Sequence, residues 1–210
     1  MISIKFKGCE EFIEKILPDP SDRYHSNTQL LMEFTIESNK EEFLGNYIKY
    51  LIEKNVFILL ITQEGNSSFY IKDISDFHLM TIELTVLDES IANYEFKKFG
   101  QIPMNVNKIL FAINNVLDEL EGKKYLLVIF DSLTDLILWH DFNMTYKFMR
   151  KCASKLRRGP RVSSIFLINK ASHSAQVLSS FETLFDGVIV SKAENECELK
   201  GPVKYRYIIH

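Results

Sequence analysis

Cysteine, proline and glycine are all scarce in this chain, and each shortage argues against a class of protein. Its 210 residues include only 3 Cys, 5 Pro and 8 Gly. The cysteines are far apart and form no Cys-x-x-Cys pair, which argues against a disulfide framework or a zinc ribbon and favours free thiols in a reducing cytoplasm. So few prolines and glycines exclude a collagen-like or linker-like polymer.

Long apolar runs and an excess of one charge are also missing. No stretch approaches the roughly 18 uninterrupted apolar residues of a membrane helix, so we expect no membrane partner. The formal net charge is −3, from 28 acidic and 25 basic residues, so the whole molecule is not a polycation that coats nucleic acid. Hydrophobic residues nevertheless make up 46% of the chain, which excludes an intrinsically disordered protein.

Short runs rich in Ile, Leu and Val are what the chain has in place of long ones. Continuous apolar runs of this length are typical of strands that are buried on both faces of a sheet. Six of them predict strands at Leu30–Ile36, Val56–Thr62, Met80–Leu87, Tyr125–Phe130, Ser164–Ile168 and Gly187–Val190. The alternating segment Lys204–Ile209 predicts an edge strand, after a hairpin turn that holds Glu194, Glu196 and Glu198.

Segments with the spacing of an amphipathic helix separate these runs. They predict helices at Glu41–Lys54, Asn105–Leu120, Asp141–Leu156 and Val177–Phe185. Strands that alternate with helices form a parallel sheet covered by those helices, so we predict an α/β fold with a mainly parallel, twisted sheet. The turn-rich start of the chain predicts an N-terminal arm or cap over residues 1–28, ahead of one α/β domain over residues 29–210.

Three stretches in the second half of the chain carry a resemblance to a known family. They read YLLVIFDSLTDLI from Tyr125, SSIFLINKAS from Ser163 and FETLFDGVIV from Phe181. In this order they resemble the C-terminal half of KaiC/RadA-like ATPases of the RecA superfamily, in which one strand ends in the Walker B Asp-Ser-Leu and a later one reads Asp-Gly-Val-Ile. The element order matches over about residues 29–210. The resemblance implies a RecA-like three-layer α/β/α fold and a protein that assembles into oligomers.

The stretch that matches the phosphate-binding loop of that family departs from its pattern. A Walker A loop needs G-x-x-x-x-G-K-[ST], because glycines let backbone amides wrap the phosphates, Lys neutralises them and the hydroxyl holds Mg²⁺. The stretch from Phe34 to Glu41 reads FTIESNKE, so it keeps Lys40 but has no glycine and ends in a carboxylate. We expect the carboxylates of Glu37, Glu41 and Glu42 to repel a phosphate, at about 4 kcal/mol per close pair for an effective dielectric constant near 20.

Two other positions of the implied nucleotide site are altered or ambiguous. The family activates the attacking water with a Glu after its second strand, where this chain has Gln63 and Glu64, and Gln is a poor base. Asp131 matches the Walker B acid, but we favour a role as a cap for the following turn, with Ser132 as its partner. The vestigial nucleotide site implied by the resemblance is Ser38, Asn39, Lys40, Glu41, Gln63, Glu64, Asp131 and Ser132. We expect no catalytic residue, no cofactor and no metal site.

The densest charge feature of the chain is a basic run between Tyr146 and Val162. It contains no acid and seven basic residues: Lys147, Arg150, Lys151, Lys155, Arg157, Arg158 and Arg161. Such a run can neutralise the phosphates of a nucleic acid or face an acidic protein surface. The alternative is a solvated helix face, because cations are favourable near a helix C-terminus.

Together these features favour a non-catalytic relative of the KaiC/RadA ATPases that acts as a scaffold or regulatory subunit. The resemblance implies assembly with itself or with an active paralogue of the same fold, linked to DNA repair and recombination or to signalling. Two alternatives stay open: an ATPase with a divergent P-loop that uses Lys40, Glu64 and Asp131, and a nucleic-acid-binding module that uses the basic run. The Lys- and Ile-rich composition hints at an archaeal or thermophilic source.

Overall fold

The computed structural model describes residues 4–7, 27–71, 74, 77–86, 99–120, 124–191 and 196–200. The strands are β1 Ile4–Lys7, β2 Gln29–Phe34, β3 Phe57–Gln63, β4 Leu79–Thr85, β5 Phe99–Pro103, β6 Leu126–Asp131, β7 Val162–Asn169, β8 Gly187–Ser191 and β9 Glu196–Lys200. The helices are α2 Lys40–Glu53, α3 Ser67–Ile71, α4 Val106–Leu120, α5 Leu133–Trp139, α6 Phe142–Arg158 and α7 Ala175–Glu182, with a short 3₁₀-helix η2 at Lys170–Ser172.

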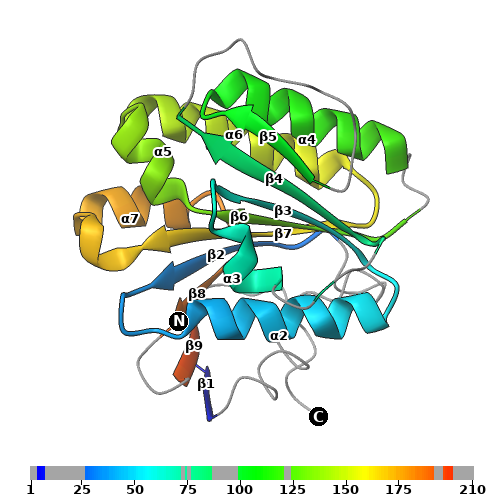
Figure 1. Cartoon of the computed structure of the whole chain (residues 1–210). Helices are drawn as coiled ribbons and strands as arrows, with labels where there is room; N and C mark the ends of the chain where they lie inside the picture. The colour runs from blue at the N-terminus through cyan, green and yellow to red at the C-terminus, as the bar shows by residue number, and fades with distance from the viewer. Residues whose placement is uncertain are drawn as a thin grey trace.

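These strands form one sheet in the order β1-β9-β8-β2-β7-β6-β3-β4-β5 (Figure 1). The seven strands from β8 to β5 are all parallel to their neighbours, whereas β9 and β1 pair antiparallel at one edge. The predicted α/β fold with a mainly parallel sheet is therefore confirmed.

Helices cover both faces of the sheet. α2 and α3 lie on one face, and α4, α5, α6 and α7 lie on the other (Figure 1). Successive side chains of a strand enter opposite cores: Leu30 and Met32 of β2 pack in the core under α2, whereas Leu31 packs in the core under α4 and α6. This is the RecA-like three-layer α/β/α architecture, and burial on both faces explains why the strand sequences are continuously apolar.

The helix and strand predictions were mostly confirmed, with clear exceptions. Each of the six predicted inner strands and four predicted helices is present, with ends displaced by a few residues. The turn predicted at Glu196 and Glu198 was wrong, because both residues belong to β9, whose edge is paired with β8 and β1. The expected strand Lys204–Ile209, Glu194 and most of the N-terminal segment lie outside the described residues.

The parallel strands place their carboxyl ends along one edge of the sheet, and α2 begins at that edge. In the register, Asp131 at the end of β6 is opposite Thr62 of β3, and Thr62 is opposite Glu83 of β4. Ligands of open α/β sheets bind beyond the carboxyl ends of strands, so this row is where a site is expected. Of the described helices, none is both long enough and apolar enough to span a membrane.

Candidate functional site

The connection from β2 to α2 is a tight turn that bonds to itself. The Ser38 hydroxyl donates to the Thr35 carbonyl at 2.7 Å, and the Ser38 amide donates to the same carbonyl at 3.1 Å. The Lys40 amide donates to the Ser38 carbonyl at 2.8 Å. In a Walker A loop, glycines turn such amides toward a phosphate. Here the amides of Ser38 and Lys40 are committed within the turn.

Lys40, the first residue of α2, bonds the carboxylate that matches the Walker B acid. Its Nζ lies 2.9 and 3.0 Å from the two oxygens of Asp131. The Lys40 side chain is only 15% exposed and that of Asp131 only 3%. Lys40 Nζ also lies 4.4 Å from the centroid of the Phe34 ring, within the range of a cation–π interaction. The two charges that a P-loop enzyme would offer to phosphate and Mg²⁺ therefore neutralise each other.

The third member of this cluster, Tyr70 of α3, was not predicted. Its hydroxyl donates to Oδ2 of Asp131. Burial, reinforced by the charge of Asp131, raises the pKa of the Tyr70 hydroxyl far above its usual value near 10, so the group remains a neutral donor. The prediction that Asp131 caps the following turn was wrong, because an ammonium group and a hydroxyl satisfy its carboxylate with charge-assisted bonds. We call Lys40, Asp131 and Tyr70 the internal ion-pair cluster.

Helix α3 is fixed over the strand ends at a second point. The Ser67 hydroxyl donates to Oε1 of Glu83 at 2.5 Å, and Glu83 is only 4% exposed. A Cβ on Gly45 of α2 would lie 3.2 Å from the Tyr70 carbonyl oxygen, so the missing side chain permits the close approach of α2 and α3. α3 thus lies beside α2 over the same face of the sheet (Figure 1). It presents Tyr70 and Ser67 to the buried carboxylates of Asp131 and Glu83, which stand on either side of β3.

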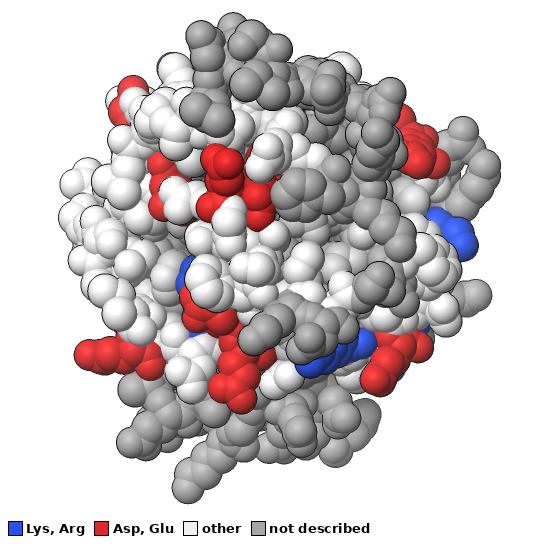
Figure 2. All heavy atoms as spheres, in the orientation of Figure 1, with Lys and Arg blue, Asp and Glu red and all other residues white. Residues whose placement is uncertain are grey.

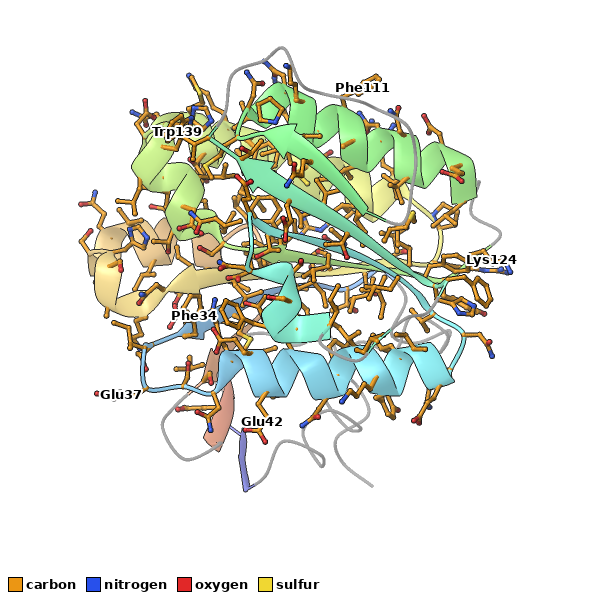
Figure 3. The ribbon with its side chains drawn as sticks, viewed as in Figure 1. Phe34, Glu37, Glu42, Phe111, Lys124 and Trp139 are labelled. Atoms are coloured by element: carbon orange, nitrogen blue, oxygen red, sulfur yellow. The ribbon has the colours of Figure 1, made fainter. Side chains whose placement is uncertain are left out.

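The three carboxylates that were expected to repel a phosphate are not equivalent in the structure. Glu41 has an oxygen 3.7 Å from Lys40 Nζ, with 45% of its side chain exposed. Glu37 and Glu42 are exposed, and in Figure 3 they project away from the sheet, with Glu37 outside the turn and Glu42 on the outer side of α2. Only Glu41 therefore lies beside Lys40, and Asp131 rather than a neighbouring Glu is its principal partner.

The remaining predicted residues of the nucleotide site lie around this cluster without joining it. Gln63 is half-buried at the end of β3, and Glu64 is exposed in the next turn. Neither side chain forms a hydrogen bond with another residue of the described ranges. Asn39 is the exposed N-cap residue of α2, and its side chain does not cap the helix. Ser132 precedes α5 and donates its hydroxyl to Asp135 at 2.7 Å, where burial raises the pKa of the Asp135 carboxyl.

The comparison with protein families gives one match. A family described as "Family of unknown function (DUF7090)" matches residues 92–200, which is just over half of the chain. The chain belongs to this family. The matched part of the DUF7090 chain includes Asp131 and all of α6, and it begins after Lys40 and Tyr70 in the sequence. No curated protein matches the chain by sequence.

Solved structures of two archaeal proteins have the fold of this DUF7090 chain. One is the protein of Project ID PH0250 from Pyrococcus horikoshii OT3, with 13% identity, a TM-score of 0.55 and 88% of each chain covered. The other is the KaiC-like protein PH0186 from the same hyperthermophilic archaeon, with 18% identity, a TM-score of 0.54 and coverage of 79% of this chain and 71% of that one. At these identities the likeness concerns the fold, and it confirms the RecA/KaiC-like architecture.

The basic run of this DUF7090 chain is divided between two environments. Lys147, Arg150, Lys151, Lys155 and Arg158 line a groove between α6 and α4. The other two basic residues face elsewhere. Arg157 donates to the Leu184 carbonyl at 2.6 Å and pairs with Asp186 at 3.4 Å, and the Arg161 guanidinium lies 5.1 Å from the centroid of the Tyr125 ring. Five of the seven predicted residues are thus brought together.

The sequence contains a weak signal for the residues that were missed. Ser67 and Tyr70 lie in a five-residue helix, which is too short to show helical periodicity. Glu83 stands within the apolar run MTIELTVL from Met80, where a buried acid needs a partner. A carboxylate in a predicted inner strand is therefore the feature that points to a polar helix above it.

Proposed function

We propose that this DUF7090 chain is a RecA-fold protein without ATPase activity, which acts as a scaffold or regulatory subunit. The observation that carries the proposal is the self-bonded turn from Thr35 to Lys40, in place of a glycine-rich loop. Support comes from Lys40, whose ammonium group is held by both oxygens of Asp131.

A nucleotide would have to undo this arrangement before it could bind. Its phosphates would compete with Asp131 for Lys40, and two charges about 4 Å apart interact by roughly 4 kcal/mol at an effective dielectric constant near 20. Freed Asp131 would remain buried with only Tyr70 as a donor, and a buried carboxylate without its cation is costly. The Glu41 carboxylate beside Lys40 would also repel the phosphates. The favourable energy of nucleotide binding would therefore be offset by the energy needed to separate Lys40 from Asp131.

Exposed apolar side chains where α5 meets α6 support a role in assembly. Leu138 is 76% exposed, Trp139 51% and Met144 45%. Large apolar residues that are close together on a surface mark protein interfaces more often than scattered ones do. The partner we propose is a second copy of this chain or an active ATPase of the same fold, as the likeness to a KaiC-like protein suggests.

Calorimetry tests the loss of nucleotide binding directly. We expect no heat of binding when the purified chain is titrated with Mg-ATP up to millimolar concentration, and no phosphate release above the buffer rate. Micromolar binding that is abolished by Lys40→Ala would overturn the proposal in favour of a divergent P-loop enzyme. The matched control is Lys49→Ala on the exposed side of α2. This variant should give the same heat of binding and the same phosphate release as the unaltered chain.

Trp139 reports on assembly, because it is the only tryptophan in the chain. We expect its emission to shift to shorter wavelength as protein concentration rises or as a RecA-fold partner is added, since an exposed indole becomes buried. Sedimentation of the same samples should show the corresponding increase in mass. A monomer at all concentrations, with unchanged emission beside a candidate ATPase, would contradict the scaffold role.

A further inference from the structure

The groove between α4 and α6 is a second candidate site, on the opposite face of the sheet from the internal ion-pair cluster. α4 and α6 lie side by side over that face (Figure 1). The groove has a volume of about 630 Å³. Its α6 wall carries Lys147, Arg150, Lys151, Lys155 and Arg158, and its α4 wall carries Leu110 and Asn114. No carboxylate lines it among the residues that the structure describes.

The five cations form one row because of their spacing. Lys147, Lys151 and Lys155 are four residues apart, and Arg150 and Arg158 each follow one of them by three residues, so all five share one face of α6. Eleven residues at a rise of 1.5 Å make this row roughly 16 Å long. All five side chains are exposed, and none forms an ion pair with another described residue. Like charges so close together repel one another, so the row gains from any extended anion that lies along it.

We propose that this groove binds the sugar–phosphate backbone of a single-stranded nucleic acid. A row of roughly 16 Å spans four to five nucleotides at the ~3.4 Å rise per nucleotide of a stacked strand. The charges of α6 would neutralise successive phosphates, which requires neither a deep pocket nor base-specific contacts. This site is independent of the proposed loss of ATPase activity.

The lining of the groove favours a nucleic acid over an acidic protein surface. Protein interfaces are anchored by aromatic and aliphatic side chains in a dry centre, whereas Leu110 is the one apolar residue of the groove's described lining. Besides the five cations, Asn114 and Ser154 complete that lining, so the groove offers polar groups rather than an apolar anchor.

An exposed aromatic ring beside the groove favours a single strand over a duplex. Phe111 is 53% exposed and stands one residue after Leu110 and three before Asn114. Residues three apart are neighbours on a helix surface. Figure 3 places Phe111 on the outer side of α4, away from the sheet. Unpaired bases stack on exposed aromatic rings while cations hold their backbone, and this combination is typical of single-strand binding.

Fluorescence anisotropy with a labelled single-stranded DNA 12-mer of mixed sequence tests the proposal. We expect salt-sensitive binding, and at least a tenfold loss of affinity in the double variant Lys151→Ala/Lys155→Ala. Two lost phosphate contacts should also reduce the slope of log K against log salt by about 1.4. Phe111→Ala should weaken binding severalfold at an unchanged slope, since stacking involves no counterion release.

The matched control removes the same charge from other surfaces. Lys49→Ala/Lys124→Ala changes exposed residues of α2 and of the segment before β6, and it should bind the 12-mer as the unaltered chain does. An equal loss in this control, or no binding at 50 mM salt, overturns the proposal. If a poly-glutamate of the same charge competes equally well with the 12-mer, the groove binds an acidic protein instead. If a DNA duplex binds more tightly than the single strand and Phe111→Ala has no effect, the single-strand assignment is wrong.

Discussion

A buried ion pair makes each partner depend on the other, and Lys40 with Asp131 is such a pair. Removal of one member of a buried pair leaves an uncompensated charge and costs roughly 3–5 kcal/mol. Lys40→Met keeps an aliphatic stem but removes the ammonium group, so it loses the cation–π contact with Phe34 and leaves Asp131 with Tyr70 alone. We expect this variant to lose about 3 kcal/mol of unfolding free energy in urea denaturation.

The double variant Lys40→Met/Asp131→Leu distinguishes an ion-pair effect from simple damage to α2. Replacement of both charges by apolar groups removes the unpaired carboxylate, so we expect most of the lost stability to return. Lys49→Met on the exposed face of the same helix should cost less than 0.5 kcal/mol, as surface substitutions typically do. A Lys40→Met variant as stable as Lys49→Met would mean that Lys40 has no structural role.

Tyr70 makes the same cluster sensitive to alkaline pH. Its pKa is raised by burial and by Asp131, so the folded state keeps the hydroxyl proton when the unfolded chain loses it. This contribution to stability is complete below the unfolded pKa near 10 and is lost as pH rises above it. The loss amounts to about 1.4 kcal/mol per pH unit.

Tyr70→Phe removes that proton and a hydrogen bond to a buried carboxylate. We expect the variant to lose about 2 kcal/mol of unfolding free energy at pH 7. The difference in unfolding free energy between the variant and the unaltered chain should narrow between pH 10 and 11. Urea denaturation at pH 7, 10 and 11 measures this difference. Tyr50→Phe on α2, a half-buried tyrosine, is the control, and a gap that stays constant for Tyr70→Phe would show that the hydroxyl is not held protonated.

At the scale of elements, the contact between α2 and α3 depends on a glycine. Gly45→Val would place a branched side chain against the Tyr70 carbonyl, which a Cβ alone already approaches to 3.2 Å. Overpacking against backbone costs roughly 1–3 kcal/mol. We expect Gly45→Val to lose about 2 kcal/mol in urea denaturation, whereas Asn46→Val, one exposed residue further along α2, should change stability little. Equal losses of stability in the two variants would indicate an effect of helix propensity rather than of the contact between α2 and α3.

The elements that the sequence predicts well are those whose own residues determine their burial. The run from Leu126 to Phe130 is buried on both faces of the sheet, so its continuous apolar character is enough to identify a strand. β5 escapes prediction because Gly100, Gln101 and Pro103 interrupt its apolar pattern, and it gains its place only by pairing with β4. A local apolar pattern does not record the hydrogen bonds that a strand forms with its neighbour in the sheet.

The candidate site was predictable in its location and only partly in its contacts. The end of β2, Lys40 and Asp131 follow from the order of strands, because parallel strands collect their carboxyl ends at one edge. The bond between Lys40 and Asp131 spans 91 positions, and the Tyr70 bond spans 61. Such contacts depend on where α3 packs, which no spacing in the sequence encodes. The five-residue row of α6 was predictable because it lies within one helix.

Acidic and basic side chains are separated on the surface of the whole molecule. The side that Figure 2 shows, with α2 below the sheet and α4 and α5 above it as in Figure 1, carries clusters of acidic side chains and few basic ones. The row of Lys and Arg lies on α6, on the opposite face of the sheet from α2. A protein of net charge −3 can attract a polyanion only through such a local field, so a strand of nucleic acid would approach the basic row of α6.

This separation predicts different thermal responses of the whole chain to two phosphate ligands. A ligand that binds only the folded state at 100 times its Kd adds about 2.7 kcal/mol, and 1 kcal/mol raises the melting temperature of a chain of this size by roughly 2–4 °C. We expect a saturating single-stranded DNA 12-mer at low salt to raise the melting temperature by more than 5 °C, and 1 mM Mg-ATP to leave it within 1 °C. Scanning calorimetry measures both melting temperatures.

Two variants separate the responses to the two ligands. Lys151→Ala/Lys155→Ala should lose most of the rise in melting temperature that DNA causes. Lys40→Met should lower the melting temperature of the free chain but keep the rise with DNA. A rise with Mg-ATP that disappears in Lys40→Met would show that nucleotide can displace Asp131 from Lys40, and a DNA response that survives the loss of both lysines would move the binding site away from the α4–α6 groove.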